Sequence, residues 1–333
     1  MTKCAELANL IGNISAGGGG ANKNFIINGM MQINQRGDST GKTSGGYYAC
    51  DRFKSDISGA GTWSIAQSTT VPSGKGFKNS VKLDCTTANG SLSSGAYFIY
   101  QQRIEGHNLQ RLAFGTSDAK PIVLSFYVKS NKTGTYHVGL FNNDNSRMNG
   151  RTYTIDSANT WEFKSISFDA DTSAGFTDDN THGLILEFWL VGGTDYTSGS
   201  TPTAWTASDN TIRAGGLAVN LADSTDNEWL LTGVQLEIGQ NPTSFEIEPI
   251  DVTLAKCQRY FNKLSELLYG GYGADSAGDY ATIWFPTEMR TDPTMANVLS
   301  GATTQHVTEK FAQSYYVGGY AGWQSTATAD AEL

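Results

Sequence analysis

The sequence predicts a mainly β protein whose central part is a jelly-roll β-sandwich. Charged residues make up only 17% of the 333 residues, whereas glycine occurs 38 times. The chain also contains 15 Phe, 15 Tyr and 7 Trp, enough aromatic side chain to fill a large core. Short β-branched and aromatic segments alternate with clusters of Gly, Asn, Asp and Ser. This combination is typical of many short strands connected by turns.

Three parts are expected along the chain: residues 1–22, 23–248 and 249–333. In the central part, short apolar segments are flanked by turn residues, and about ten such strands fit the two sheets of a jelly roll. The clearest candidates are residues 25–27, 80–87, 121–130, 135–143, 161–170, 183–193, 216–224 and 229–239.

Residues 193–214 interrupt this rhythm with a long, polar segment that contains few strand-forming residues. Loops of this length in compact domains are often functional. The segment carries two large aromatic residues, Tyr196 and Trp205.

The N-terminal part, residues 1–22, is interpreted as a docking peptide on a hinge. Its apolar residues are spaced as on one face of a helix, and glycines at 17–20 form a flexible joint. A helix this short needs a partner surface. An ordinary frayed terminus is the alternative. The candidate attachment residues are Leu7, Leu10, Ile11 and Ile14.

The C-terminal part, residues 249–333, is expected to begin with a helix and to continue as a small β domain. Asp251 is a plausible N-cap. Apolar residues from Leu254 to Leu268 follow a heptad spacing, but a short helix followed by a strand fits almost as well, because Tyr260 and Phe261 favour strands. Residues 272–333 return to β character.

A phosphate-binding loop is excluded at residues 35–53. Gly41-Lys42-Thr43 matches the end of that motif, but only three residues separate Gly37 from Gly41, where the motif requires four. The segment that follows is rich in Gly and Tyr and does not begin a helix.

The Arg36-Gly37-Asp38 tripeptide of adhesion ligands overlaps the same stretch and is interpreted as an ordinary turn. We therefore expect Asp38 and Lys42 to be exposed and free of ligand, and Phe53 to be buried.

Other chemistry is also disfavoured. The net charge of −9 argues against nucleic-acid binding, and no apolar run approaches the roughly 20 residues of a membrane-spanning helix. The four cysteines are expected as free thiols, with one disulfide as the alternative. The four histidines are isolated, so no metal site, cofactor or catalytic residue is expected. Residues 178–180 beside His182 are interpreted as a solvated turn rather than a calcium site.

Recognition of a sugar at the protein surface is the function that these exclusions leave. A pyranose has an apolar face and a polar rim, so exposed aromatic rings beside amides and carboxylates suit it. Trp63, Tyr196 and Trp205 lie in Gly-, Ser- and Thr-rich surroundings, and Tyr272 and Trp323 are further candidates in the C-terminal part. The alternative for each is an aromatic at the rim of a core.

Two stretches carry a resemblance to a known family. These are "NFIINGMMQINQRG" followed by "GYYACDRF", and "GVQLEIGQNPTSFEIEPIDVTLAKCQRYF" followed by "FPTEMRTDPTM" and "GWQSTATADAEL". Residues 23–333 thereby resemble a module of tailed-bacteriophage fibre and receptor-binding proteins.

The resemblance implies a carbohydrate-binding-module-like jelly roll at residues 24–247, whose first strand lies close to its last, with Val234, Leu236 and Ile238. Residues 257–260 would lead into the C-terminal domain. Asn28-Gly29-Met30-Met31 departs from related jelly rolls, which often have an acidic calcium ligand here, and Met cannot replace it.

The function expected from these observations is that of a non-enzymatic phage virion fibre protein that binds a host-surface glycan. The fibre would be a homotrimer, attached to a tail or head protein of the virion through its N-terminus and made in the host cytoplasm. A structural spacer or capsid-decorating fibre is the main alternative. A polysaccharide depolymerase is a further one, although no β-helical repeat is visible.

Overall fold

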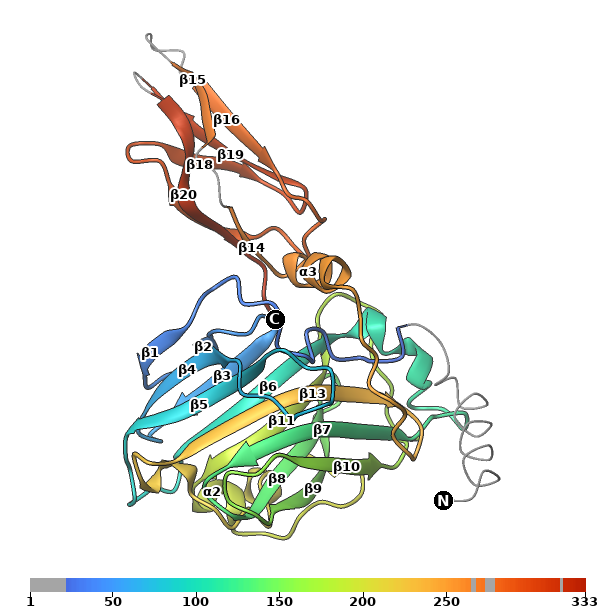
Figure 1. Ribbon diagram of the computed structural model, residues 1–333. Coiled ribbons are helices and arrows are strands. Elements are labelled where there is room, and N and C mark those ends of the chain that lie inside the picture. Colours follow the sequence, from blue (N-terminus) through green and yellow to red (C-terminus); the bar gives the residue numbers. More distant parts are fainter. Residues whose placement is uncertain (1–21, 265–267, 273–278, 318–319) are drawn as a thin grey trace. The chain divides into compact units, whose positions relative to one another are not determined.

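The computed structural model describes residues 22–264, 268–272, 279–317 and 320–333 (Figure 1). Within these residues the chain divides between Ile247 and Glu248 into two compact units, which are described separately. We call them the sandwich unit and the C-terminal unit.

The sandwich unit is built from two antiparallel sheets, which confirms the predicted fold class. Sheet A has the order β1 (Ser39–Lys42), β4 (Thr62–Ser68), β5 (Ser80–Thr87), β13 (Glu228–Ile238), β7 (Ile122–Ser130) and β10 (Glu162–Phe168). Sheet B has the order β12 (Thr206–Ala207), β9 (Arg147–Ile155), β8 (Gly134–Asn142), β11 (His182–Gly192), β6 (Tyr97–Glu105), β3 (Phe53–Ser58) and β2 (Gly46–Tyr47).

Short helical turns connect these strands. They are η1 (Gly106–Asn108), η2 (Gln110–Leu112), α2 (Thr194–Thr197), η3 (Asn210–Ile212) and η4 (Leu221–Asp223).

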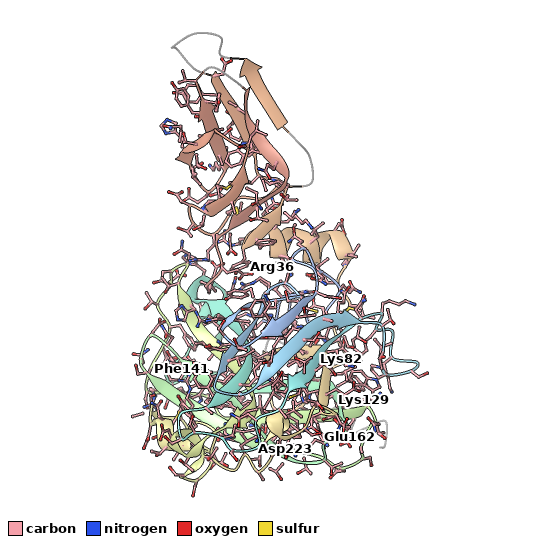
Figure 2. The ribbon with its side chains drawn as sticks, turned by 90° about the vertical axis from the view of Figure 1, so that its left-hand side faces the viewer. Arg36, Lys82, Lys129, Phe141, Glu162 and Asp223 are labelled. Carbon is pink, nitrogen blue, oxygen red and sulfur yellow. The ribbon has the colours of Figure 1, made fainter. Side chains whose placement is uncertain are left out.

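Aromatic side chains fill the space between the sheets. The rings of Phe126 from sheet A and Phe188 from sheet B lie 5.1 Å apart, nearly perpendicular to each other. Trp229 of β13 packs on Phe188 at 5.7 Å. Lys82 and Lys129 belong to sheet A, whereas Phe141 lies on the opposite side of the sandwich, on sheet B (Figure 2).

The strand predictions hold where apolar residues alternate. Residues 216–224 are an exception, because they form a loop and the turn η4 instead of a strand. The side chain of Asn220 accepts a hydrogen bond from Ala222 N (2.9 Å), and this local bond favours a turn.

Residues 25–27 do not form a strand, and Ile27 already belongs to a turn. Phe25 N donates to Leu236 O (2.8 Å), and Val234 N donates to Gly29 O (3.0 Å). The first segment therefore lies beside β13, as the resemblance implied. The buried Asn28 holds the following turn, because its side chain accepts from Ile33 N (3.0 Å).

The C-terminal unit contains helix α3 (Ile250–Gln258) and two small antiparallel sheets, as expected for a small β domain. In one sheet β20 (Tyr320–Asp330) pairs with β14 (Phe261–Lys263), β15 (Leu268–Tyr272) and β17 (Thr294–Val298). The other has the order β16 (Asp279–Trp284), β19 (Phe311–Tyr316) and β18 (Thr303–Val307).

The short helix followed by a strand is the correct alternative for the start of this unit, and the heptad seam is wrong. Helix α3 ends at Gln258, and Phe261 begins β14. The N-cap residue is Pro249, which makes no side-chain cap, whereas the predicted cap residue Asp251 lies in the first turn. A carboxylate there still interacts favourably with the helix dipole.

Three of the four cysteines, Cys50, Cys85 and Cys257, are buried free thiols, and Cys4 lies outside the described residues. Among the described helices, none has the length and apolar character needed to cross a bilayer.

Candidate functional site

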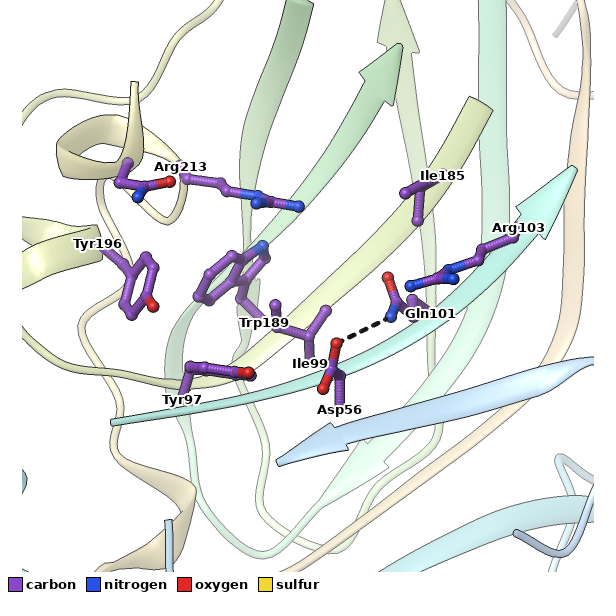
Figure 3. Close-up of a pocket in the computed structure, with 10 residues that line it drawn as sticks. Asp56, Tyr97, Ile99, Gln101, Arg103, Ile185, Trp189, Tyr196 and Arg213 are labelled. Carbon is purple, nitrogen blue, oxygen red and sulfur yellow. Dashed lines mark hydrogen bonds between the residues drawn. The ribbon is translucent and has the colours of Figure 1, made fainter. Parts of the chain in front are cut away.

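A hollow of about 210 Å³ lies on the outer face of sheet B (Figure 3). We call it the sheet-B hollow. It is lined by Asp56, Tyr97, Ile99, Gln101, Arg103, Ile185, Trp189, Tyr196, Asn210 and Arg213.

The floor of the hollow follows from the two-residue period of strands β6 and β11. Side chains alternate between the two faces of a sheet. Because Phe98 and Tyr100 lie in the core, Tyr97, Ile99 and Gln101 point outward. Ile99 of β6 is paired with Trp189 of β11, so these two side chains are direct cross-strand neighbours on the same face.

One wall of the hollow comes from the polar segment 193–214. Gly193 N donates to Ala96 O (2.7 Å), and Ala214 N donates to Tyr196 O (2.9 Å). The first bond holds the segment beside the start of β6, and the second closes the segment on itself. Tyr196 and Arg213 thereby lie beside Trp189 (Figure 3).

Three aromatic rings are in contact at this wall. Tyr196 packs against Tyr97 with ring centroids 5.6 Å apart and against Trp189 at 5.2 Å. Trp189 is fully buried, whereas both tyrosines are half-buried. The rings available to a ligand are therefore those of Tyr97 and Tyr196, supported from below by Trp189.

A buried carboxylate organises the same wall. Glu187 is 2% exposed and accepts hydrogen bonds from Trp189 Nε1 (3.0 Å) and Arg213 Nε (3.2 Å), and Arg213 Nη2 bonds its other oxygen. The Arg213 guanidinium also lies over the Phe141 ring, 4.5 Å from its centroid. Although burial lowers the pKa of Arg213, Glu187 outweighs it and the net shift is upward.

The opposite side of the hollow is polar. Gln101 Nε2 donates to Asp56 Oδ2 (3.4 Å), and Lys54 Nζ lies 3.8 Å from the same oxygen. Burial raises the pKa of Tyr97, and the nearby Asp56 charge raises it further, so the Tyr97 hydroxyl keeps its proton and can donate a hydrogen bond.

His137 lies near Glu187 and Arg213, and the three residues line the same small space. Burial lowers the pKa of His137 to about 4, so the ring is neutral at pH 7. Because the contact of Nδ1 is a carbonyl, Gly215 O at 2.9 Å, Nδ1 carries the proton. Nε2 has no hydrogen-bond partner among the described residues, and His137 lines a space of about 10 Å³, which is about the least that can hold one water.

No group of three or more His, Cys, Asp or Glu side chains capable of holding a metal occurs in the described part of the chain. At residues 178–182, Asp179 accepts from Thr181 N (2.9 Å), which is a local turn bond, and His107 Nδ1 lies 2.7 Å from Asp178 Oδ1.

Of the predicted sugar-binding residues whose side chains are described, only Tyr196 lines the hollow. Trp205 is half-buried, packs on Phe114 at 5.5 Å and donates from Nε1 to Asp169 O (2.7 Å). Trp63 and Trp323 are wrong as ligand residues, because both are fully buried in the cores of their units and offer no face to a ligand.

Two other sets of predicted residues are not tested. Tyr272 lies in β15, opposite Tyr320, but its side chain is outside the described part. The candidate attachment residues Leu7, Leu10, Ile11 and Ile14 also lie outside the described residues.

Arg36 lies in a bend, and Gly37 and Asp38 lie in a loop that leads directly into strand β1, so the tripeptide does not form the predicted turn. Phe53 is fully buried, and Asp38 is exposed and accepts from Gln67 N (2.9 Å). Lys42 is only half-exposed, which corrects the prediction: its ammonium lies over the Tyr48 ring, 4.7 Å from the centroid.

Sequence reasoning missed the residues that β3 and β6 contribute, namely Asp56, Tyr97, Gln101 and Arg103. The only available signal was the alternation in "YFIYQQRIE", which places Tyr97, Gln101 and Arg103 on one face of the strand together with the apolar Ile99.

Neither a protein-family model nor a curated protein matches the sequence. Solved structures resemble the chain weakly. The enzymatically active domain of tailspike protein 4 from bacteriophage CBA120 has a TM-score of 0.33 at 14% identity, with 65% of this chain and 22% of that chain covered. The present chain thus spans less than a quarter of the tailspike chain.

Two further similar structures are covered over nearly their whole length. A putative sugar binding protein from Bacteroides thetaiotaomicron has a TM-score of 0.32 at 13% identity, covering 65% of this chain and 100% of that chain. A family 11 carbohydrate-binding module from Clostridium thermocellum has a TM-score of 0.28 at 13% identity, covering 62% and 98%. Similarity at this level carries no functional argument.

Proposed function

We propose that this protein binds a host-surface glycan in the sheet-B hollow and does not cleave it. The observation that carries the proposal is the contact of two half-exposed rings, Tyr97 and Tyr196, beside Asp56, Gln101 and Arg213. Aromatic rings suit the apolar face of a sugar, while amide, carboxylate and guanidinium groups bond its hydroxyls.

The hollow is suited to recognition because its residues stand on rigid elements. Tyr97 and Gln101 belong to the middle of sheet B, and Arg213 is fixed by Glu187. A site whose side chains are already held in place loses little conformational entropy on binding.

The chemistry of the carboxylates favours binding over cleavage. Glycoside hydrolysis usually needs two carboxyl groups that can reach the scissile bond. Glu187 is buried and bonded to Arg213 and Trp189, so it supports the site and does not face a ligand. A depolymerase would release reducing ends from host polysaccharide, and we expect no such release.

The biological setting that we propose is a fibre of a bacteriophage virion, on the tail or the head. The resemblance of residues 23–333 to phage fibre modules supports this setting, and the N-terminal docking peptide would attach the fibre. In a homotrimer, three hollows would act together, so that a weak single site gains strength through avidity.

Glycan-array binding of the full chain tests the proposal, with Tyr196→Ala as the site variant. Phe163→Ala is the matched control, because Phe163 is 49% exposed on sheet A and lies outside the hollow. We expect a glycan signal that Tyr196→Ala lowers about tenfold or more and Phe163→Ala leaves unchanged. Absence of any glycan signal, together with normal adsorption of virions that lack the protein, would favour the structural-spacer alternative.

A further inference from the structure

The C-terminal unit exposes a row of aromatic side chains on one face of the sheet that contains β16, β19 and β18. Trp284 is 68% exposed and Tyr280 is 52% exposed. Exposed aromatic groups of this size usually mark an interaction surface. We call this surface the aromatic face and define it by Tyr280, Thr282, Trp284, Phe311, Gln313 and Tyr315.

Strand register assembles this face. In the β16–β19 pair, Tyr280 lies opposite Tyr315, and Trp284 lies opposite Phe311. Both pairs make ring contact, each with centroids 5.0 Å apart. The intervening residues, such as Ala312, point to the other side of the sheet and are buried in the core of the unit.

A polar pair separates the two aromatic pairs. Thr282 is paired with Gln313, whose Nε2 donates to Thr282 Oγ1 (2.9 Å). Tyr280 and Trp284 are four residues apart on one strand, so the two aromatic pairs are separated by about 13 Å. Along one line, the face therefore presents an aromatic pair, then the amide of Gln313 with the hydroxyl of Thr282, and then a second aromatic pair.

The charge of the face distinguishes its ligand. None of its six residues carries a formal charge, although the chain as a whole has a net charge of −9. An uncharged ligand matches such a face, because it requires no counter-charge and is not repelled by the acidic remainder. The central Gln313 and Thr282 also favour a ligand with hydroxyl groups over the apolar core of a typical contact between copies.

We infer that the aromatic face is a second carbohydrate platform, which binds an extended, uncharged polysaccharide by stacking sugar rings on the Trp284–Phe311 and Tyr280–Tyr315 pairs. This site is separate from the sheet-B hollow and belongs to a different unit. The chain would thus carry two sugar sites, and their linkage would raise the affinity for a polymer above that of either site alone.

Affinity electrophoresis of the full chain in hydroxyethylcellulose, dextran and mannan tests this inference, with polygalacturonate as the charged comparison. We expect at least one uncharged polymer to retard the wild-type chain. Trp284→Ala should weaken that retardation about tenfold, and Trp284→Phe should restore part of it. Phe163→Ala again serves as the matched control, since it removes a similarly exposed aromatic side chain elsewhere.

The Tyr196→Ala variant separates this inference from the proposed function. Retardation that survives Tyr196→Ala but is lost with Trp284→Ala supports the aromatic face even if the hollow binds nothing. Equal retardation of the wild-type and Trp284→Ala chains, or no retardation by any of the three uncharged polymers, would overturn the inference. Light scattering gives a further test. If the wild-type chain is an oligomer and the Trp284→Ala variant dissociates, the face is a contact between copies and the inference is wrong.

Discussion

Substitution of Glu187 by Gln should destabilise the sandwich unit and weaken its sugar site together. The change keeps the shape of the side chain and removes its charge. Arg213 would then lose its ionic partner in a place where its side chain is only 24% exposed. The new amide also brings two donors towards Arg213 and Trp189, which are themselves donors.

The size of the effect follows from the burial of both partners. Breaking a buried ion pair by removing one partner costs about 3–5 kcal/mol. Arg213 reaches water in part and keeps its contact with Phe141, and the Gln carbonyl can still accept one hydrogen bond. We therefore expect the free energy of unfolding to fall by about 2 kcal/mol, which lowers the Tm of this unit by about 4–8 °C.

Urea and thermal unfolding measure this loss, with Glu228→Gln as the control. Glu228 also pairs with a cation, Lys82 at 2.7 Å, but its side chain is 25% exposed on sheet A. The control should change stability by about 1 kcal/mol or less. In the Glu187→Gln, Arg213→Met double variant, the loss should be smaller than the sum of the single losses. A Glu187→Gln variant as stable as the control would refute the role assigned to this carboxylate.

Two further predictions concern buried residues outside the ligand surface. Trp63→Ala should lower the free energy of unfolding by about 3–5 kcal/mol, because it opens a cavity in the core. Glycan affinity measured below the new Tm should be unchanged. A selective loss of affinity in a fully folded variant would instead show that Trp63 is a ligand residue. The folded-state pKa of His137, about 4, lies below the ordinary value of 6.5, so between these pH values the unfolded chain binds the extra proton. Stability should therefore rise by about 3 kcal/mol from pH 4 to 6.5 through this residue, and His137→Asn should flatten that part of a pH series of urea unfolding curves, whereas parallel curves for the two proteins would contradict it.

The strands of the sandwich could be predicted because their pattern is local. Val81, Leu83 and Cys85 alternate with polar residues, and β5 covers the expected residues 80–87. Residues 216–224 have similar apolar content, but the side-chain cap from Asn220 favours a turn. Such competition between a local hydrogen bond and a strand cannot be resolved from periodicity alone.

The candidate site could be predicted only in part. The unusual composition of residues 193–214 indicated Tyr196, because a long polar loop stands out in a β sequence. Tyr97 and Gln101 were missed, because only the pairing of β6 with β11 and β3 determines which face becomes the hollow. Trp63 was misassigned for the same reason: its neighbours are polar in sequence, but its ring contacts Phe98 in the core at 4.7 Å.

The most direct test of the proposed glycan site is a crystal structure of the full chain soaked with the glycan that gives the strongest array signal. We predict a sugar ring against Tyr97 and Tyr196, with hydroxyl groups bonded to Asp56, Gln101 or Arg213. A glycan bound elsewhere on the sandwich unit, with the sheet-B hollow holding only solvent, would contradict the proposal.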